Sequence, residues 1–135
     1  MKYLLDSNTC IVYLKQADSG VRRRLERQSP QDIVVCSVVK AELFYGAKKS
    51  KKAEENLAKQ RKFFSHFLSL PFDDAGAEIY GDIRADLETK GTPIGAYDLQ
   101  IAAIALANSL ILVTHNTREF SRIRDLMIED WEVVG

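Results

Sequence analysis

The pattern of apolar and polar positions predicts short buried strands that alternate with helices. Three apolar runs have the length and composition of strands buried on both faces: residues 3–5, 33–36 and 110–113. Two weaker candidates are residues 69–72, whose Pro71 suits an edge strand, and residues 131–134. A polar residue able to cap a helix follows each of the strong candidates: Asp6 or Ser7, Ser37, and Thr114 or Asn116.

Helical periodicity marks five further segments: residues 18–27, 38–48, 52–68, 75–90 and 99–107. In the fourth, apolar residues recur at every fourth position from Ala75 to Leu87, and Lys90-Gly91 is typical of a helix C-terminus. Strands alternating with helices predict an α/β fold with a parallel sheet covered on both faces. With no internal repeat or long linker, we expect one domain over residues 1–135.

The charge balance excludes two descriptions of the whole chain. With 19 Lys and Arg against 19 Asp and Glu, it is neither a strongly basic nucleic-acid coat nor an acidic disordered tail. The average hides one basic stretch, residues 40–62, where eight basic and three acidic residues leave a net charge of +5. The sequence Arg22-Arg23-Arg24 is a second basic cluster. Either could contact phosphates, although lysine runs on helices are as often simply solvated faces.

The location expected from sequence is the cytoplasm. Cys10 and Cys36 both lie in apolar stretches rather than in a disulfide-dense pattern, and no signal peptide is recognisable. No apolar run approaches the roughly 20 residues of a membrane span.

Several carboxylates fall where the strands of a parallel sheet end, which is where α/β folds bind ligands. Asp6 follows the first strand, Asn116 and Glu119 follow the strand 110–113, and Asp98 opens the apolar helix 99–107. Glu42 lies among apolar neighbours on a helix that should pack on the sheet, where a carboxylate is costly unless it is paired or binds a metal. Clustered carboxylates favour a hard cation such as Mg²⁺, which can support hydrolysis of a phosphodiester.

Each of these residues also has a purely structural interpretation. Asp6 could cap a helix, Asp98 suits the dipole of a first helical turn, and Asn116 with Glu119 has the spacing of a capping box. The chain has no Cys or His pair at the spacing typical of zinc ligands. We therefore expect neither of its two histidines, at positions 66 and 115, to be a ligand or a base.

Four sequence motifs resemble, in order, those of PIN-domain ribonucleases, and among them the VapC-type toxins of bacterial type II toxin–antitoxin systems. They are LLDSNT at 4–9, SVVKAELFYGA at 37–47, GTPIGAYDLQIAA at 91–103 and VTHNTREF at 113–120. The resemblance implies a three-layer α/β/α sandwich and an acidic site that depends on Mg²⁺ or Mn²⁺. It implies cleavage of single-stranded or looped RNA, tRNA-like RNA included, with 5′-phosphate and 3′-hydroxyl products.

The resemblance also assigns roles to residues. Asp6, Glu42 and Asp98 match the three principal acidic positions and would hold the metal. Ser7 stands where the family usually has threonine, and Asn116 where it often has aspartate, so both are provisional members of the catalytic site. The basic residues Lys48, Lys49, Lys51 and Lys52 would contact RNA phosphates.

The partners that the resemblance implies are a VapB-type antitoxin and a second copy of the chain. The antitoxin would cover the acidic site and bind operator DNA, so that this chain meets DNA only indirectly. The aromatic residues that could line its groove are Phe63, Phe64, Phe67 and Tyr45, although core packing is the more ordinary fate for at least half of them.

Three alternatives to a nuclease remain to be weighed. A phosphotransfer receiver domain expects paired acids after the first strand and a lysine after the last, yet Ser7 and Asn8 follow Asp6 and no lysine follows Val113. Phosphatases of the haloacid-dehalogenase type need a second aspartate at position 8, which is asparagine. The remaining alternative is a catalytically silent PIN-fold module that binds RNA or protein.

Overall fold

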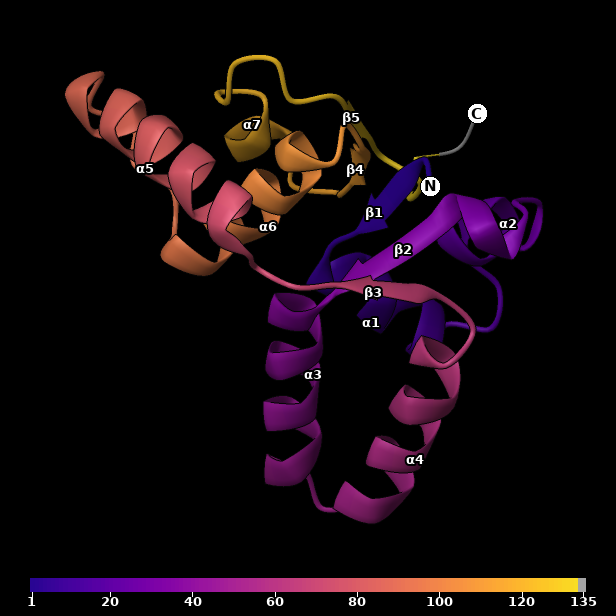
Figure 1. Ribbon diagram of the computed structural model, residues 1–135. Helices are drawn as coiled ribbons and strands as arrows, with labels where there is room; N and C mark the ends of the chain where they lie inside the picture. The colour runs from indigo at the N-terminus through magenta and orange to yellow at the C-terminus, as the bar shows by residue number, and fades with distance from the viewer. Residues whose placement is uncertain (134–135) are drawn as a thin grey trace.

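A five-stranded parallel sheet forms the centre of the computed structural model, which describes residues 1–133 (Figure 1). The strand order is β3-β2-β1-β4-β5. The strands are β1 (Tyr3–Leu5), β2 (Ile33–Cys36), β3 (Leu68–Leu70), β4 (Ile111–Val113) and β5 (Ile128–Glu129). The predictions for β1 and β2 are confirmed to the residue, and β4 begins one residue later than expected. The weak strand at 69–72 lies one to two residues earlier as β3, which leaves Pro71 outside the ladder.

The strand expected at 131–134 is wrong. The fifth strand is β5, where Ile128 pairs with Leu112 and Glu129 pairs with Val113. Trp131 lies beyond it in a bend, 2% exposed, with its ring edge-on to Tyr3 at a centroid distance of 5.1 Å. The segment was predicted to be a strand because of its apolar residues, but the apolar ring of Trp131 is instead buried in the core. Val134 lies outside the described residues.

Helices connect the strands: α1 (Ser7–Lys15), α2 (Gly20–Glu26), α3 (Ser37–Lys49), α4 (Ala53–Phe64), α5 (Asp74–Thr89), α6 (Ala96–Ala107) and α7 (Thr117–Phe120), with a 3₁₀ turn at Pro30–Asp32. The helix predicted at 52–68 ends at Phe64, because Leu68 already pairs in β3. The predicted end of α5 is confirmed: Gly91 has φ of 71°, and Thr92 N–H donates to Leu87 O at 2.9 Å, as in a Schellman motif.

The predicted helix caps have mixed outcomes. Asp6 caps α1, because its Oδ1 accepts the N–H of Thr9 at 2.9 Å. At α3 the cap position falls on Cys36 and Ser37 is already helical, so the cap expected at Ser37 is wrong. Asn116 occupies the cap position of α7, but its side chain does not cap that helix.

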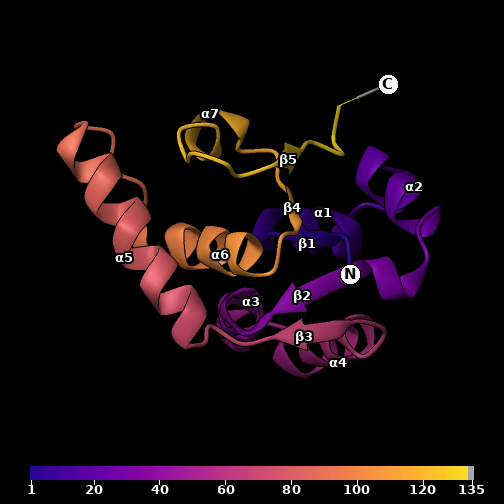
Figure 2. The same ribbon diagram turned by 45° about the horizontal axis from the view of Figure 1, so that its top comes forward.

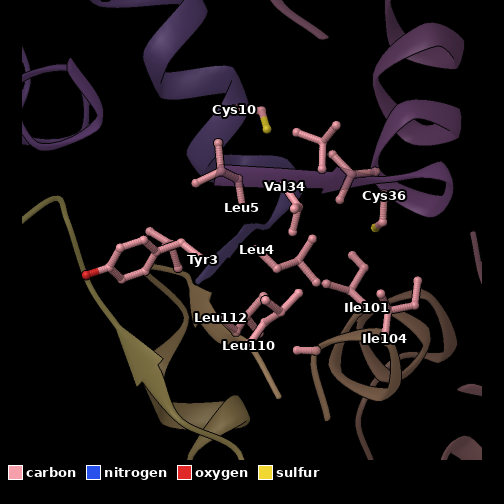
Figure 3. Packing of buried hydrophobic residues seen from close by; sticks show 14 of the residues in the cluster. Tyr3, Leu4, Leu5, Cys10, Val34, Cys36, Ile101, Ile104, Leu110 and Leu112 are labelled. Carbon is pink, nitrogen blue, oxygen red and sulfur yellow. The ribbon is translucent and has the colours of Figure 1, made fainter. Parts of the chain in front are cut away.

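Helices cover both faces of the sheet in three layers, as expected. The connections from β1 to β2 and from β2 to β3 run the same way along the sheet, while those from β3 to β4 and from β4 to β5 run back. Right-handed crossovers therefore place α1–α4 on one face and α5–α7 on the other. Figure 3 shows Leu5 with Cys10 of α1 on one side of the sheet and Leu4 with Ile101 of α6 on the other.

The two outermost parts of the fold are a helix and a helical hairpin. In Figure 2, α5 runs along the outer side of α6, away from the sheet. The helices α3 and α4 project from the sheet as an antiparallel hairpin whose connection lies at the far end (Figure 1). Phe63 and Phe64 of this hairpin are buried in the core and Phe67 packs against it, which confirms core packing for most of the aromatic group.

Cys10 and Cys36 are free thiols with no exposed surface, and burial raises the pKa of both. Within residues 1–133, no helix combines the length and apolarity needed to cross a bilayer.

Candidate active site

Asp6 is fixed by the junction of β1 and α1 at the carboxyl end of the central strand. It is 6% exposed, and its backbone N–H continues the sheet by donating to Val113 O at 3.1 Å. The hydroxyl of Thr9 donates to the same carbonyl, which ties the first turn of α1 to β4. Burial raises the pKa of Asp6, and hydrogen bonding from Thr114 and Thr9 opposes that rise. Capping and a functional role are therefore compatible, because the cap uses one carboxylate oxygen.

Glu42 reaches the same region from the second turn of α3. It is half-buried, and its Oε1 is shielded from water without a hydrogen-bond partner among residues 1–133. The hydroxyl oxygen of Ser7, directly after Asp6, is also buried and has no hydrogen-bond partner among these residues. A third such oxygen, Gln60 Oε1, belongs to α4. A buried polar oxygen without a partner costs about 1–3 kcal/mol, so those of Glu42 and Ser7 are available to a ligand at the end of β1.

Asp98 provides the evidence that these carboxylates lie close together. It sits in the first turn of α6 and its pKa is raised to about 6, first by burial and then by repulsion from Glu42, Asp6 and Glu119. Burial alone would raise the pKa of a carboxyl group, but the contributions from Glu42, Asp6 and Glu119 show that these three carboxylates are near enough to Asp98 to repel its charged form. The cap residue of α1 and residues of α3, α6 and α7 thus form one acidic cluster, which we call the four-carboxylate site: Asp6, Glu42, Asp98 and Glu119.

The fourth member differs from the residue expected from sequence. Asn116 is exposed, and its side-chain amide donates to Glu119 Oε2 at 3.1 Å. Its backbone N–H donates to Thr114 Oγ1 at 3.0 Å, which fixes the turn after β4. Asn116 therefore holds Glu119, while Glu119 exerts the electrostatic effect on Asp98. The signal was present as the spacing Asn-x-x-Glu, but a capping box has the same spacing.

The donor set of the site suits a hard divalent cation. Four carboxylates in partial burial repel one another, and their oxygens are the ligands that Mg²⁺ and Mn²⁺ accept. The unpartnered oxygens of Glu42 and Ser7 are the kind of atoms that a cation and its bound waters would satisfy. The residues present therefore fit such an ion.

The lysines expected to contact RNA lie elsewhere. Lys48 and Lys49 end α3, while Lys51 and Lys52 form its connection to α4, and all four are exposed. Lys48 is six residues beyond Glu42, which corresponds to about 9 Å along the helix axis. They occupy the far tip of the α3–α4 hairpin (Figure 1). They would reach only a substrate that extends along the hairpin.

The arginine cluster of α2 is engaged within the protein. Arg22 donates to the carbonyls of Tyr13 and Gln16, Arg23 pairs with Asp18, and Arg24 donates to Asp130 O at 2.9 Å. These contacts indicate that Arg22 and Arg24 secure the packing of α2, which weakens the expectation of a phosphate-binding rim there.

Two exposed tyrosines border the site. Tyr45 of α3 and Tyr97 of α6 are each 65% exposed, and they line the same hollow as Glu42, Ser37 and Gln100. Exposed rings beside an acidic site are suited to stacking against planar groups.

Comparisons with known proteins agree with this geometry. Residues 3–126 match the family model described as PIN domain. The chain is 42% identical over 131 residues to the tRNA(fMet)-specific endonuclease VapC of Salmonella typhimurium, a match that covers 97% of this chain and 98% of the relative. It is 39% identical to ribonuclease VapC2 of Rickettsia felis, covering 98% and 99% of the two chains. A crystal structure of DNA-bound VapBC from Salmonella typhimurium superposes with a TM-score of 0.92 at 42% identity, over 97% of this chain and 98% of that one.

Proposed function

This chain belongs to the PIN-domain family, among its VapC ribonucleases, and from that premise we propose that it is the toxin of a type II toxin–antitoxin pair, an endoribonuclease that requires a divalent metal. The observation that carries the proposal is the set of buried acidic and hydroxyl oxygens at the carboxyl end of β1: Asp6 is 6% exposed, and Glu42 Oε1 and Ser7 Oγ have no partner among the described residues. The raised pKa of Asp98, at about 6, caused first by burial and then by the surrounding carboxylates, agrees with it. Without a cation, repulsion between these carboxylates destabilises the fold, and such perturbed groups are concentrated at functional sites.

We infer that Mg²⁺ is the ion and that Asp6, Glu42, Asp98 and Glu119 hold it, with Mn²⁺ as a substitute that accepts the same oxygens. When bound, the ion supplies a water of lowered pKa and stabilises negative charge on the phosphate. The buried cap position fixes Asp6, and the first turn of α6 fixes Asp98. Asn116 orients Glu119 through its amide, and the free hydroxyl of Ser7 is available to a metal-bound water.

The substrate we propose is looped, single-stranded RNA, with tRNA as the first class to test. The Salmonella relative bears the name of a tRNA(fMet)-specific endonuclease. Tyr45 and Tyr97 support an unpaired substrate, because bases can stack on exposed rings only when they are not already stacked in a duplex. Attack by water at phosphorus, with cleavage of the P–O3′ bond and protonation of the departing 3′ oxygen, would leave 5′-phosphate and 3′-hydroxyl ends.

The partner we propose is a VapB-type antitoxin, with operator DNA bound through that partner. The similar Salmonella structure is a DNA-bound VapBC complex. We also propose a homodimer, a cytoplasmic location and a single PIN domain over residues 1–135. One sheet and one continuous core that includes Tyr3 and Trp131 support the last of these.

The test is cleavage of a folded tRNA pool by purified chain, free of antitoxin, with mapping of the new 5′ ends. We expect cleavage with Mg²⁺, none with chelator, and none by Asp98→Asn. The matched control is Asp82→Asn, which changes an exposed aspartate of α5 and should cleave as the wild type does. If wild type and Asp98→Asn bind RNA equally and neither cuts it, the catalytically silent module is the correct description.

A further inference from the structure

A second group of ligand atoms, which shares no residue with the four-carboxylate site, lies near enough to it for Asp6 to raise the pKa of His115 and for Asp130 to raise the pKa of Asp6. His115 follows β4, while Asp130 and Glu132 follow β5, and one ligand atom from each of the three lies within 4.8 Å of the others. Both strands end at the same edge of the sheet, so residues about fifteen positions apart in sequence come together. Sequence spacing could not reveal this group, and His115 was expected to be neither a ligand nor a base.

The distances suit ligands of one ion. His115 Nδ1 lies 2.9 Å from Asp130 Oδ2 and 3.8 Å from Glu132 Oε2. Two ligands bound at about 2.1 Å lie about 3.0 Å apart in an octahedral site and about 3.4 Å apart in a tetrahedral one. The distance to Asp130 is slightly short and the distance to Glu132 slightly long, and the two carboxylates offer oxygens within 4.8 Å of each other, so binding of one ion would require the side chains to rotate.

The backbone that carries the two carboxylates is firmly held. Between them lies Trp131, buried against Tyr3. The other oxygen of Asp130, Oδ1, accepts the backbone N–H of Glu132 at 2.9 Å, and the carbonyl of Asp130 accepts from Arg24. These contacts hold Asp130 with its Oδ2 toward His115 and hold the backbone of Glu132, so that only the Glu132 side chain has to be oriented when an ion binds.

The group carries negative charge that the protein does not balance. Among residues 1–133, His115 is the only cationic partner of Asp130 and Glu132 within 4.0 Å. A single imidazolium cannot neutralise two carboxylates. Asn8 adds a long contact of 3.5 Å to Glu132, which brings no charge. The imidazole is 56% exposed, so an ion from solution can reach it.

We propose that His115, Asp130 and Glu132 form a second divalent-cation site, selective for a transition-metal ion such as Zn²⁺ over Mg²⁺. An imidazole nitrogen is a good ligand for Zn²⁺ and a poor one for Mg²⁺, which prefers oxygen. Three protein ligands leave at least one position for water or for an anion. The four-carboxylate site offers only oxygen, so the two sites should prefer different metals.

The test uses tag-free, chelator-treated full-length protein and Zn²⁺ titrated against a chromophoric chelator in excess Mg²⁺. We expect one Zn²⁺ per wild-type chain, retained in Asp98→Asn and weakened at least tenfold in His115→Gln. The matched control is His66→Gln, another exposed histidine, which should bind Zn²⁺ as the wild type does. Circular dichroism confirms that each variant is folded.

A second readout identifies the ligand. With Co²⁺ in place of Zn²⁺, the visible spectrum should change in His115→Gln and Asp130→Asn but not in Asp98→Asn. Absence of Zn²⁺ binding in excess Mg²⁺, or equal affinity in His115→Gln, would overturn the proposal. Loss of Zn²⁺ in Asp98→Asn with retention in His115→Gln would also overturn it, by locating the ion in the four-carboxylate site. Because the readout is metal binding, it is independent of whether the chain cuts RNA.

Discussion

The amide of Asn116 donates to Glu119 Oε2 at 3.1 Å, and Glu119 in turn helps to raise the pKa of Asp98. The family resemblance predicted a role at position 116 alone, whereas the structure links Asn116 and Glu119. Glu119 brings the negative charge to the site, and Asn116 fixes its direction. Groups that orient metal ligands commonly contribute 10- to 100-fold to affinity or activity, so the division has measurable consequences.

The first prediction concerns this pair. Glu119→Gln removes the charge and should lower Mg²⁺ affinity and RNA cleavage by about 10- to 100-fold. Asn116→Ala should give a smaller loss, because the charge remains and only its orientation is relaxed. Asn116→Asp should also weaken Mg²⁺ binding, since it places a second carboxylate beside Glu119 Oε2. Isothermal titration with Mg²⁺ measures all three; stronger binding by Asn116→Asp would mean that position 116 is itself a ligand.

The second prediction follows from the raised pKa of Asp98. An acid whose pKa is about 6 when folded and 3.8 when unfolded binds more protons in the folded state between those values. Its contribution to metal-free stability therefore falls as pH rises through that window, and at pH 7 the charged group is destabilising. Asp98→Asn should stabilise the metal-free protein at pH 7 by about 1–2 kcal/mol, a figure reduced for screening by water.

Urea unfolding at pH 7 and pH 4 measures this effect, with Asp82→Asn as the control on the exposed surface of α5. The gain from Asp98→Asn should shrink at pH 4, where the wild-type carboxyl group is largely protonated when folded. Saturating Mg²⁺ should reverse the order at pH 7, because it stabilises only the chain that keeps the carboxylate. A variant no more stable than wild type without metal would show that the carboxylates do not strain the fold.

Local signals account for the parts of the fold that were predicted correctly. The strands β1 and β2 are uninterrupted apolar runs followed by polar residues, a pattern typical of strands buried on both faces of a parallel sheet. Gly91 marks the end of α5 because a left-handed residue is needed there. The same local logic failed at 131–134, where one buried tryptophan resembles part of a strand. Whether Trp131 pairs or packs depends on Tyr3, which is 128 residues away.

Part of the candidate site could be predicted, because a carboxylate that directly follows a parallel strand lies at the carboxyl edge of the sheet. Asp6 follows this rule, Asp98 was identified at the start of an apolar helix, and Glu42 was identified by its apolar neighbours. Glu119 was ambiguous because helix capping and metal binding favour the same spacing. The group of His115, Asp130 and Glu132 could not be found at all, since only the pairing of β4 with β5 brings its members together.

The third prediction compares two glycines. A Cβ added at Gly20 would lie 2.5 Å from the carbonyl oxygen of Trp131, whereas one at Gly81 would have nothing within 4 Å. Gly20→Ala should therefore push α2 from the segment that follows β5 and cost about 1–3 kcal/mol. Gly81→Ala, in the interior of α5, should stabilise by about 0.5–1 kcal/mol through helix propensity. Thermal unfolding measures both effects. A Gly20→Ala midpoint equal to that of the wild type would show that the contact with Trp131 relaxes without cost.

The fourth prediction tests the lysines at the tip of the α3–α4 hairpin. If RNA runs along the hairpin from the four-carboxylate site, these side chains contact its phosphates and release counterions on binding. Each phosphate contact with a single strand contributes about −0.7 to the slope of log K against log salt concentration. The double variant Lys51→Gln/Lys52→Gln should therefore lower the magnitude of the slope by up to about 1.4. Combining it with Lys48→Gln and Lys49→Gln should lower it further.

Binding is measured by fluorescence anisotropy in the Asp98→Asn background, so that the RNA stays intact. The charge-matched control is Arg84→Gln/Lys90→Gln, which removes two cations from α5 that are already paired with Glu88 and Asp86. A smaller slope in the hairpin variant alone would identify the hairpin as part of the RNA path. Equal slopes in both variants would mean that the basic stretch of residues 40–62 is a solvated surface, and that the substrate is held by the metal site and by Tyr45 and Tyr97 instead.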